Sequence, residues 1–311
     1  MNVTKRIDNL VLIVNGGKGS GNFGHAGRLG LVGGSASDKL NSGIKWGGDT
    51  PYGSKNFQKS VEKISKELEN QYGISLSHTR ILKQKVFTSY YNSSFSGCAG
   101  KCKVDGTGQI DIAIADWEAE KEDVSSKSKN VKFFNTDTSV EGTIRHEMGH
   151  AITGELSQHI VKNSSKSGGI EHTIWEQRDA AVKEVYNYIN SSLARVAEKT
   201  AKANGLTMST RVKKEDSEKY RAMSEYGIKG GDKEIVAESI ANPNYSVVTK
   251  TVTEHLKKIV KLAQENNYDD VFDFYRDANK IILNSTNVSK SFDLCIGYTR
   301  NREDLERLLN N

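Results

Sequence analysis

The pentapeptide His146-Glu147-Met148-Gly149-His150 is the most informative pattern in this 311-residue chain. On an α-helix, residues four apart lie on one face about one turn apart, so both imidazoles can reach a single cation. The carboxylate between them can reach a water on the same ion. Zinc prefers nitrogen and oxygen ligands in a tetrahedral arrangement, with one position left open in catalytic sites. The pattern therefore predicts a helix that binds Zn²⁺ through His146 and His150.

A catalytic zinc site needs a third protein ligand, which we expect downstream of the motif. The extended pattern H-E-x-x-H-x-x-G-x-x-H is excluded, because Thr153 and Leu156 occupy its glycine and last histidine positions. No Gly-Thr-x-x-Asp run follows the motif either. These exclusions favour a glutamate on a second helix.

Glu234, in the segment 232–241, is the best candidate for this ligand. Glu234 and Glu238 lie four residues apart on one face of a predicted helix that is otherwise largely apolar. Two carboxylates there are costly unless a positive group lies opposite, and a zinc ion with its imidazole ligand would supply one. We expect Glu234 to bind the metal and Glu238 to accept the N–H of a ligating histidine. The sequence alone leaves the choice between the two glutamates open.

Two further residues have the chemistry that peptide hydrolysis requires. Glu147 is the candidate general base, because its carboxylate can take a proton from a metal-activated water. Tyr226 precedes the Glu234 segment, and its hydroxyl is the candidate donor to the oxyanion that forms during hydrolysis.

The segments EGTIRHEMGHAITGEL (141–156) and SEYGIKGGDKEIVAESIAN (224–242) together resemble the catalytic domain of anthrax lethal factor-like zinc metallopeptidases, in the gluzincin clan. That family pairs a helix of the type E-G-x-x-H-E-x-G-H-A with a downstream S-x-Y segment and an E-x-x-A-E-x-x-A helix. The resemblance implies a zincin fold, a zinc cofactor and peptide-bond hydrolysis. It also implies the site roles, with His146, His150 and Glu234 as ligands, Glu147 as general base, Glu238 as the carboxylate behind a ligand and Tyr226 as transition-state donor.

Hydrophobic periodicity predicts the order of the elements. Helices are expected over 54–73, 139–159, 171–203, 233–241, 245–263, 268–283 and 303–309. Short strands are expected over 74–78, 85–91 and 109–115, with 206–233 irregular. The expected fold class is α+β: a zincin-like fold with a small mixed sheet packed on the motif helix and a mostly helical C-terminal half.

Glycine content sets the expected domain limits. Residues 15–53 hold 13 of the 28 glycines, so 1–53 is expected to be a glycine-rich N-terminal segment or linker. The metallopeptidase domain is expected over 54–311, with a sheet and motif-helix half (54–160) and a helical half (161–311). A G-x-G-x-x-G pattern lies at 19–24, but the glycines after it prevent the helix that nucleotide binding requires. The block also resembles a glycine-rich motif in tailed-phage head modules, which implies a phage or prophage origin.

Composition limits the partners. The net charge is only +5, and basic and acidic residues are interleaved, so no nucleic-acid surface is expected. The apolar run 10–14 is too short to span a bilayer and does not fit a secretory signal, so neither a membrane nor secretion is expected. The expected partner is a protein or peptide substrate such as a phage head or host protein, in the host cytoplasm or the virion. Cys98 and Cys102 are expected to be unpaired thiols, with a local disulfide or half of a metal site as alternatives.

The motif also leaves a second function open. The chain could be a phage head-associated structural or interaction protein whose zincin domain is a catalytically silent scaffold. An intact Glu147 argues against this alternative, because a scaffold has no physical need for a general base.

Overall fold

The computed structural model describes residues 43–48, 50–95, 98–105, 108–127, 137–164, 175–211, 220–266, 268 and 271–284. Its helices are α3 (Lys55–Tyr72), α4 (Gln84–Tyr91), α5 (Asp116–Ala119), α6 (Val140–Ser164), α7 (Trp175–Ala203), α9 (Glu225–Gly230), α10 (Asp232–Ala241), α11 (Val247–Glu265) and α12 (Val271–Asn284). Its strands are β1 (Lys45–Trp46), β2 (Thr79–Ile81), β3 (Gly100–Val104) and β4 (Ile110–Ile114). The predicted apolar run at 10–14, the glycine pattern at 19–24 and the helix at 303–309 lie outside the described residues.

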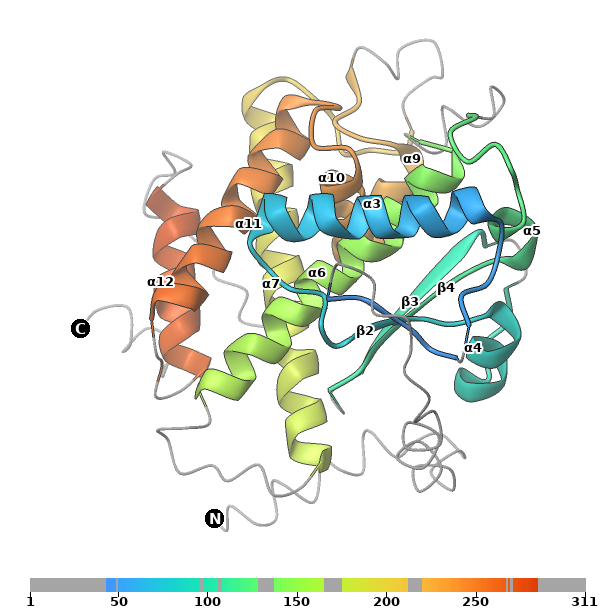
Figure 1. The fold of residues 1–311 in the computed structure, drawn as a ribbon. Helices are drawn as coiled ribbons and strands as arrows, with labels where there is room; N and C mark the ends of the chain where they lie inside the picture. The colour runs from blue at the N-terminus through green and yellow to red at the C-terminus, as the bar shows by residue number, and fades with distance from the viewer. Residues whose placement is uncertain are drawn as a thin grey trace.

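The four strands form one small mixed sheet in the order β1-β2-β4-β3. β1, β2 and β4 run parallel, whereas β3 is antiparallel to β4 and forms one edge. Alternate residues of β4 face opposite sides of the sheet. Ile110, Ile112 and Ile114 enter the main core, and Ala113 packs with Phe87 of α4 on the other face. The sheet therefore lies between the short helix α4 and the long helices of the main core (Figure 1).

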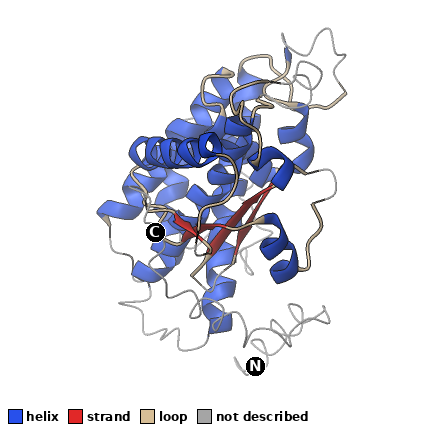
Figure 2. Ribbon diagram, turned by 45° about the vertical axis from the view of Figure 1, so that its right-hand side comes forward, coloured by secondary structure: helices blue, strands red, loops and turns tan. Residues whose placement is uncertain are grey.

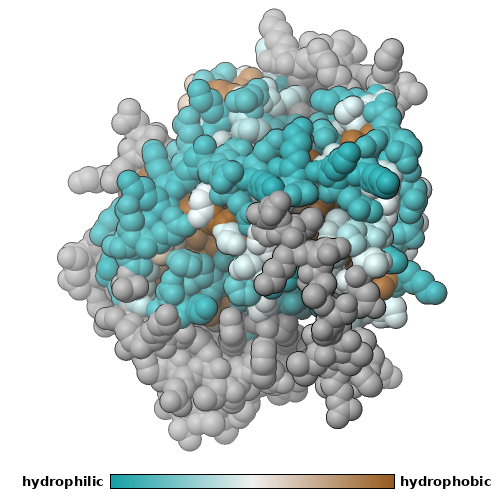
Figure 3. All heavy atoms as spheres, viewed as in Figure 1, coloured by the Kyte–Doolittle hydropathy of each residue, from teal (hydrophilic) through white to brown (hydrophobic). Residues whose placement is uncertain are grey.

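Most of the helical structure lies to one side of this sheet (Figure 2). α6 lies closest to the sheet and contacts β3, β4, α3, α7 and α10. One continuous core joins residues from both expected halves, including Met148 and Leu193. The fold is thus α+β with a small mixed sheet and a mostly helical second half, as the sequence predicted. The face crossed by α3 is largely hydrophilic (Figure 3), in keeping with the solvent-facing lysines and glutamates of that helix.

The packed core begins before the domain limit expected at residue 53. Ile44 and Trp46 are buried, and β1 pairs with β2. Tyr52 packs edge-on against Trp46 with ring centroids 5.5 Å apart. These contacts tie residues 44–52 to the sheet, while the limit itself stays a prediction because residues 1–42 lie outside the described part of the chain.

Helix ends follow the expected capping chemistry. The Ser54 side chain accepts a hydrogen bond from the Phe57 amide, and Gly73 ends α3 in the left-handed conformation at φ 69°. Ser139 Oγ accepts the Gly142 amide at 2.9 Å, so α6 begins at Val140. The helix continues to Ser164, five residues beyond the expected end.

Two predicted strands are wrong, each for a physical reason. The segment 85–91 is rich in residues that favour strands, but it belongs to α4, because Phe87 packs against Ala113 of the sheet and against the ring of Tyr91 one turn away, with centroids 4.8 Å apart. Residues 74–78 alternate between buried and exposed but join no strand. Glutamate side chains there replace a strand partner: the Leu76 amide donates to Glu69 and the His78 amide to Glu155, both at 2.7 Å. The region expected to be irregular also contains the short helix α9.

Candidate metal centre

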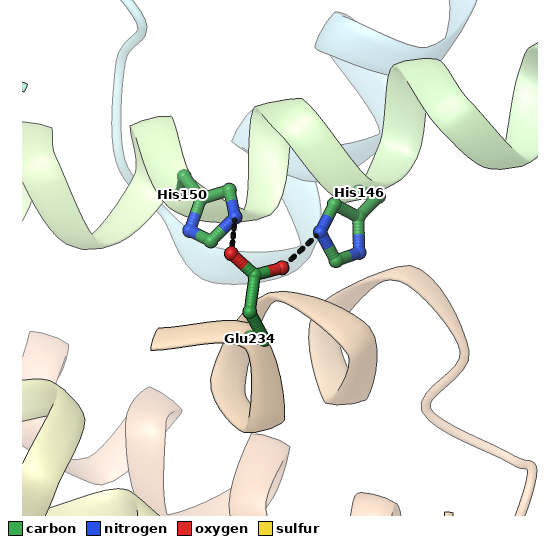
Figure 4. A group of neighbouring side chains, drawn as sticks. All are labelled: His146, His150 and Glu234. Carbon is green, nitrogen blue, oxygen red and sulfur yellow. Dashed lines mark hydrogen bonds and ion pairs between the residues drawn. The ribbon is translucent and has the colours of Figure 1, made fainter. Parts of the chain in front are cut away.

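Two helices far apart in sequence bring three candidate ligands together. His146 and His150 project from α6 toward Glu234 at the start of α10 (Figure 4). Glu234 Oε2 lies 2.8 Å from His146 Nε2, and Glu234 Oε1 lies 3.4 Å from His150 Nε2. One ligand atom from each residue lies within 4.8 Å of the others. This separation is compatible with a single ion about 2.0–2.2 Å from each atom, so the group could hold a metal ion.

The close crossing of α6 and α10 depends on Gly149. A Cβ atom at this position would lie 3.0 Å from both Cα and O of Ala237 on α10. These are backbone atoms, which cannot move aside without shifting the helix. The missing side chain therefore sets the distance between the two helices that carry the ligands.

Replacing Gly149 by valine should force α10 away from α6. Overpacking of this kind typically costs about 1–3 kcal/mol in free energy of unfolding. We expect a lower melting temperature, together with weaker metal binding, because Glu234 moves with α10. Lys162→Val, on the exposed side of the same helix, controls for the helix propensity of valine. Equal melting temperatures for the two variants would show that the helices do not cross as described.

Glu238 and Tyr226 both lie beside the His146 ring. Glu238 Oε2 lies 3.5 Å from His146 Nδ1. The rings of Tyr226 and His146 meet edge to face, with centroids 5.4 Å apart. Tyr226 is held in α9, where Ser224 caps the helix by accepting the Gly227 amide. The structure thus gathers all six site residues expected from the sequence, with Glu234 facing both Nε2 atoms and Glu238 facing Nδ1 of His146.

The electrostatics of this cluster favour a cation. Burial would lower the pKa of His146, but hydrogen bonds with Glu234 and Glu238 raise it to about 10. Burial opposes ionisation of Glu234, yet its hydrogen bonds with His146 and His150 hold its pKa well below the usual range. The Glu234 carboxylate is therefore kept charged and His146 protonated, so the cluster attracts positive charge, and a divalent ion that binds here would displace the proton of His146.

Glu147 lies beside the cluster against the edge strand β3. A Cβ atom at Gly100 would lie 2.7 Å from Cγ and Oε1 of Glu147, so a side chain at position 100 would displace that of Glu147. Burial raises the pKa of Glu147, while the neighbouring His146 and His150 lower it. Opposing effects therefore act on the pKa of this carboxyl group, which lies at the edge of the site, where a general base has to reach its substrate.

Tyr186 of α7 is a site residue that the sequence analysis missed. Its hydroxyl oxygen lies 3.4 Å from His150 Nδ1, opposite the nitrogen that faces Glu234. Burial raises the pKa of Tyr186, so the phenol stays protonated. The sequence showed only that 171–203 would form a helix, and no local pattern indicates which of its tyrosines meets α6.

Cys102 also lies close to the cluster. Burial raises the pKa of its thiol, and the carboxylates of Glu147, Asp111 and Glu234 add to this effect. Cys98 and Cys102 are not joined by a disulfide. The thiol of Cys102 is therefore held in its neutral form.

No protein-family model, curated protein or solved structure is detectably similar to this chain. Its function therefore has to be inferred from the geometry of the site. Among the described residues, no helix is long and apolar enough to cross a membrane.

Proposed function

We propose that the chain is a zinc-dependent endopeptidase with a zincin-like fold. The observation that carries the proposal is the convergence of His146, His150 and Glu234 beside the buried carboxylate of Glu147. A metal site that served structure alone would use closed coordination and would not need Glu147 at its edge. The combination supports metal-assisted hydrolysis of a peptide bond.

The donor set fits zinc. Two imidazole nitrogens and one carboxylate form the set that a catalytic zinc takes from a protein, with a further position left for water or substrate. Each ligating histidine has a partner on its other ring nitrogen, Glu238 for His146 and Tyr186 for His150. Such partners fix the ring orientation and the tautomer, so that Nε2 is free to bind the metal.

The chemistry follows from the positions of three groups. When bound, zinc would lower the pKa of a water molecule and polarise the scissile carbonyl. Glu147 takes the proton from the attacking water and passes it to the leaving amine. Tyr226 donates a hydrogen bond to the oxygen that becomes negative. Burial raises the pKa of Tyr226, and the carboxylates of Glu234 and Glu147 raise it further, so the hydroxyl keeps the proton that it has to donate.

We place the peptide substrate along the edge strand β3. Among the residues that the structure describes, β3 pairs with β4 alone, and Gly100 brings it directly against Glu147. An extended peptide that pairs with the open edge of β3 would carry its backbone past the general base. This arrangement supports cleavage within a chain, because the open edge puts no limit on the length of the peptide.

Removal of the metal tests the proposal. A chelator should abolish cleavage of a peptide library, and added Zn²⁺ should restore it. Metal at about 100 times its Kd stabilises the folded state by roughly 2.7 kcal/mol, so the melting temperature should rise by several degrees when zinc is added. His146→Ala should lose this rise, and His159→Ala, on the exposed side of the same helix, should keep it.

Two outcomes would contradict the proposal. If zinc causes no thermal shift in the parent protein, the metal site is wrong. If zinc binds but no library peptide is cleaved, the catalytically silent scaffold is favoured. We expect the natural substrate to be a phage head protein or a host protein.

A further inference from the structure

Strand β3 presents two lysines on the side that faces away from α6. Gly100 approaches Glu147 and Val104 approaches Gly154, so these positions face α6. Lys101 and Lys103 alternate with them and point to the opposite face. Their ammonium groups lie over aromatic rings beside α4, with Lys101 Nζ 5.5 Å from the Phe95 ring centroid and Lys103 Nζ 5.9 Å from that of Tyr91.

The positive charge of these lysines is not cancelled by a carboxylate. No described residue forms an ion pair with Lys101 or Lys103, and Lys101 Nζ donates instead to Ser93 Oγ at 2.9 Å. The nearest acidic residue of the sheet, Asp111, is committed to Arg80 through two hydrogen bonds of 2.8 Å and to the Tyr91 hydroxyl. Asp105, which follows β3, also approaches the Tyr91 hydroxyl, at 3.5 Å. Because Lys101, Lys103 and Arg80 stand against only Asp105 and Asp111 here, the outer face of the edge strand carries net positive charge.

A third lysine extends this charge to the metal-binding helix. Lys233 directly precedes Glu234, and its Nζ lies 5.0 Å from the ring centroid of Tyr186. The side chain of Lys233 is exposed, so its charge is open to solvent beside the site. Lysines that only protected a strand edge from aggregation would not require this charge on α10.

Building on the endopeptidase function proposed above, we propose that the enzyme selects acidic peptides, with Asp or Glu at two positions two residues apart on one side of the cleaved bond. A peptide paired with β3 alternates its side chains between the two faces. Side chains on the outer face would therefore lie beside Lys101 and Lys103, while those between them face α6 and the metal. The general base Glu147 lies beside Gly100, and Lys101 and Lys103 both follow this position in β3. Both lysines therefore lie on the same side of the bond that is cleaved.

The test is the cleavage of a randomised peptide library by the zinc-loaded parent and by the double variant Lys101→Gln/Lys103→Gln. The parent should enrich Asp and Glu at two positions spaced i and i+2. For matched peptides with acidic or amide side chains there, kcat/KM should favour the acidic peptide by up to about fivefold per charged pair at low salt. Added salt should reduce the preference. The double variant should lose the preference, mainly through a higher KM.

A matched control comes from α11. Lys257 also lies over an aromatic ring, 5.8 Å from the centroid of Tyr72, and Lys250 is likewise exposed. Lys250→Gln/Lys257→Gln changes the net charge equally and should keep the acidic preference. Cleavage by the parent without acidic enrichment, or equal enrichment by the Lys101/Lys103 variant, would overturn the inference but leave the endopeptidase function intact. If no peptide is cleaved at all, the endopeptidase function itself fails.

Discussion

Replacing Glu147 by glutamine should lower kcat for peptide cleavage by about 10²–10⁴-fold, the usual contribution of a general base. Glutamine has nearly the same shape but cannot accept a proton from the attacking water. Because Glu147 is not one of the three converging ligands, the variant should still bind zinc in a 1:1 ratio. The measurements are kcat on a cleaved library peptide and the zinc content of the purified protein.

Glu141→Gln is a matched control for this change. Glu141 lies in the first turn of the same helix and accepts a hydrogen bond from Ser60 Oγ at 2.9 Å, away from the metal ligands. This variant should keep the parent kcat. If Glu147→Gln cleaves as well as the parent while zinc is bound, Glu147 is not the base and the mechanism is wrong.

Replacing Glu234 by alanine should produce the largest loss of metal affinity. This carboxylate faces Nε2 of both histidines, so its removal leaves two ligands of three. Glu238→Ala should cost less, roughly 10- to 100-fold in affinity, which is typical of a residue that orients a ligand. Competition with a chromogenic chelator measures the zinc dissociation constants of both variants. We expect Glu234→Ala to raise the dissociation constant by more than about 100-fold.

Glu254→Ala on the exposed side of α11 is the control for the loss of one negative charge. It should bind zinc as the parent does. If Glu238→Ala weakens binding more than Glu234→Ala, the two glutamates exchange roles, and the ligand set has to be reassigned to His146, His150 and Glu238.

Several parts of the fold could be predicted because their causes are local. Ser54 and Gly73 mark the ends of α3 through backbone hydrogen bonds and a left-handed residue. The alternation of Ile110, Ile112 and Ile114 indicated β4 because the side-chain period of a strand is two residues. The segment 85–91 was predicted wrongly because its strand propensity was overridden by packing of Phe87 against the outer face of the sheet.

The motif helix and its chemistry could be predicted from the chain alone, because two histidines four residues apart share a helix face in any surroundings. The sequence also indicated two glutamates with the same spacing. How the two helices meet depends on packing between them. Because Gly149 has no side chain, α10 approaches α6 closely enough for Glu234 to face both imidazoles, while Glu238 lies behind one of them. The position of Tyr186 behind His150 and the path of β3 past Glu147 likewise depend on packing between distant segments. Such contacts leave no periodic pattern in the chain.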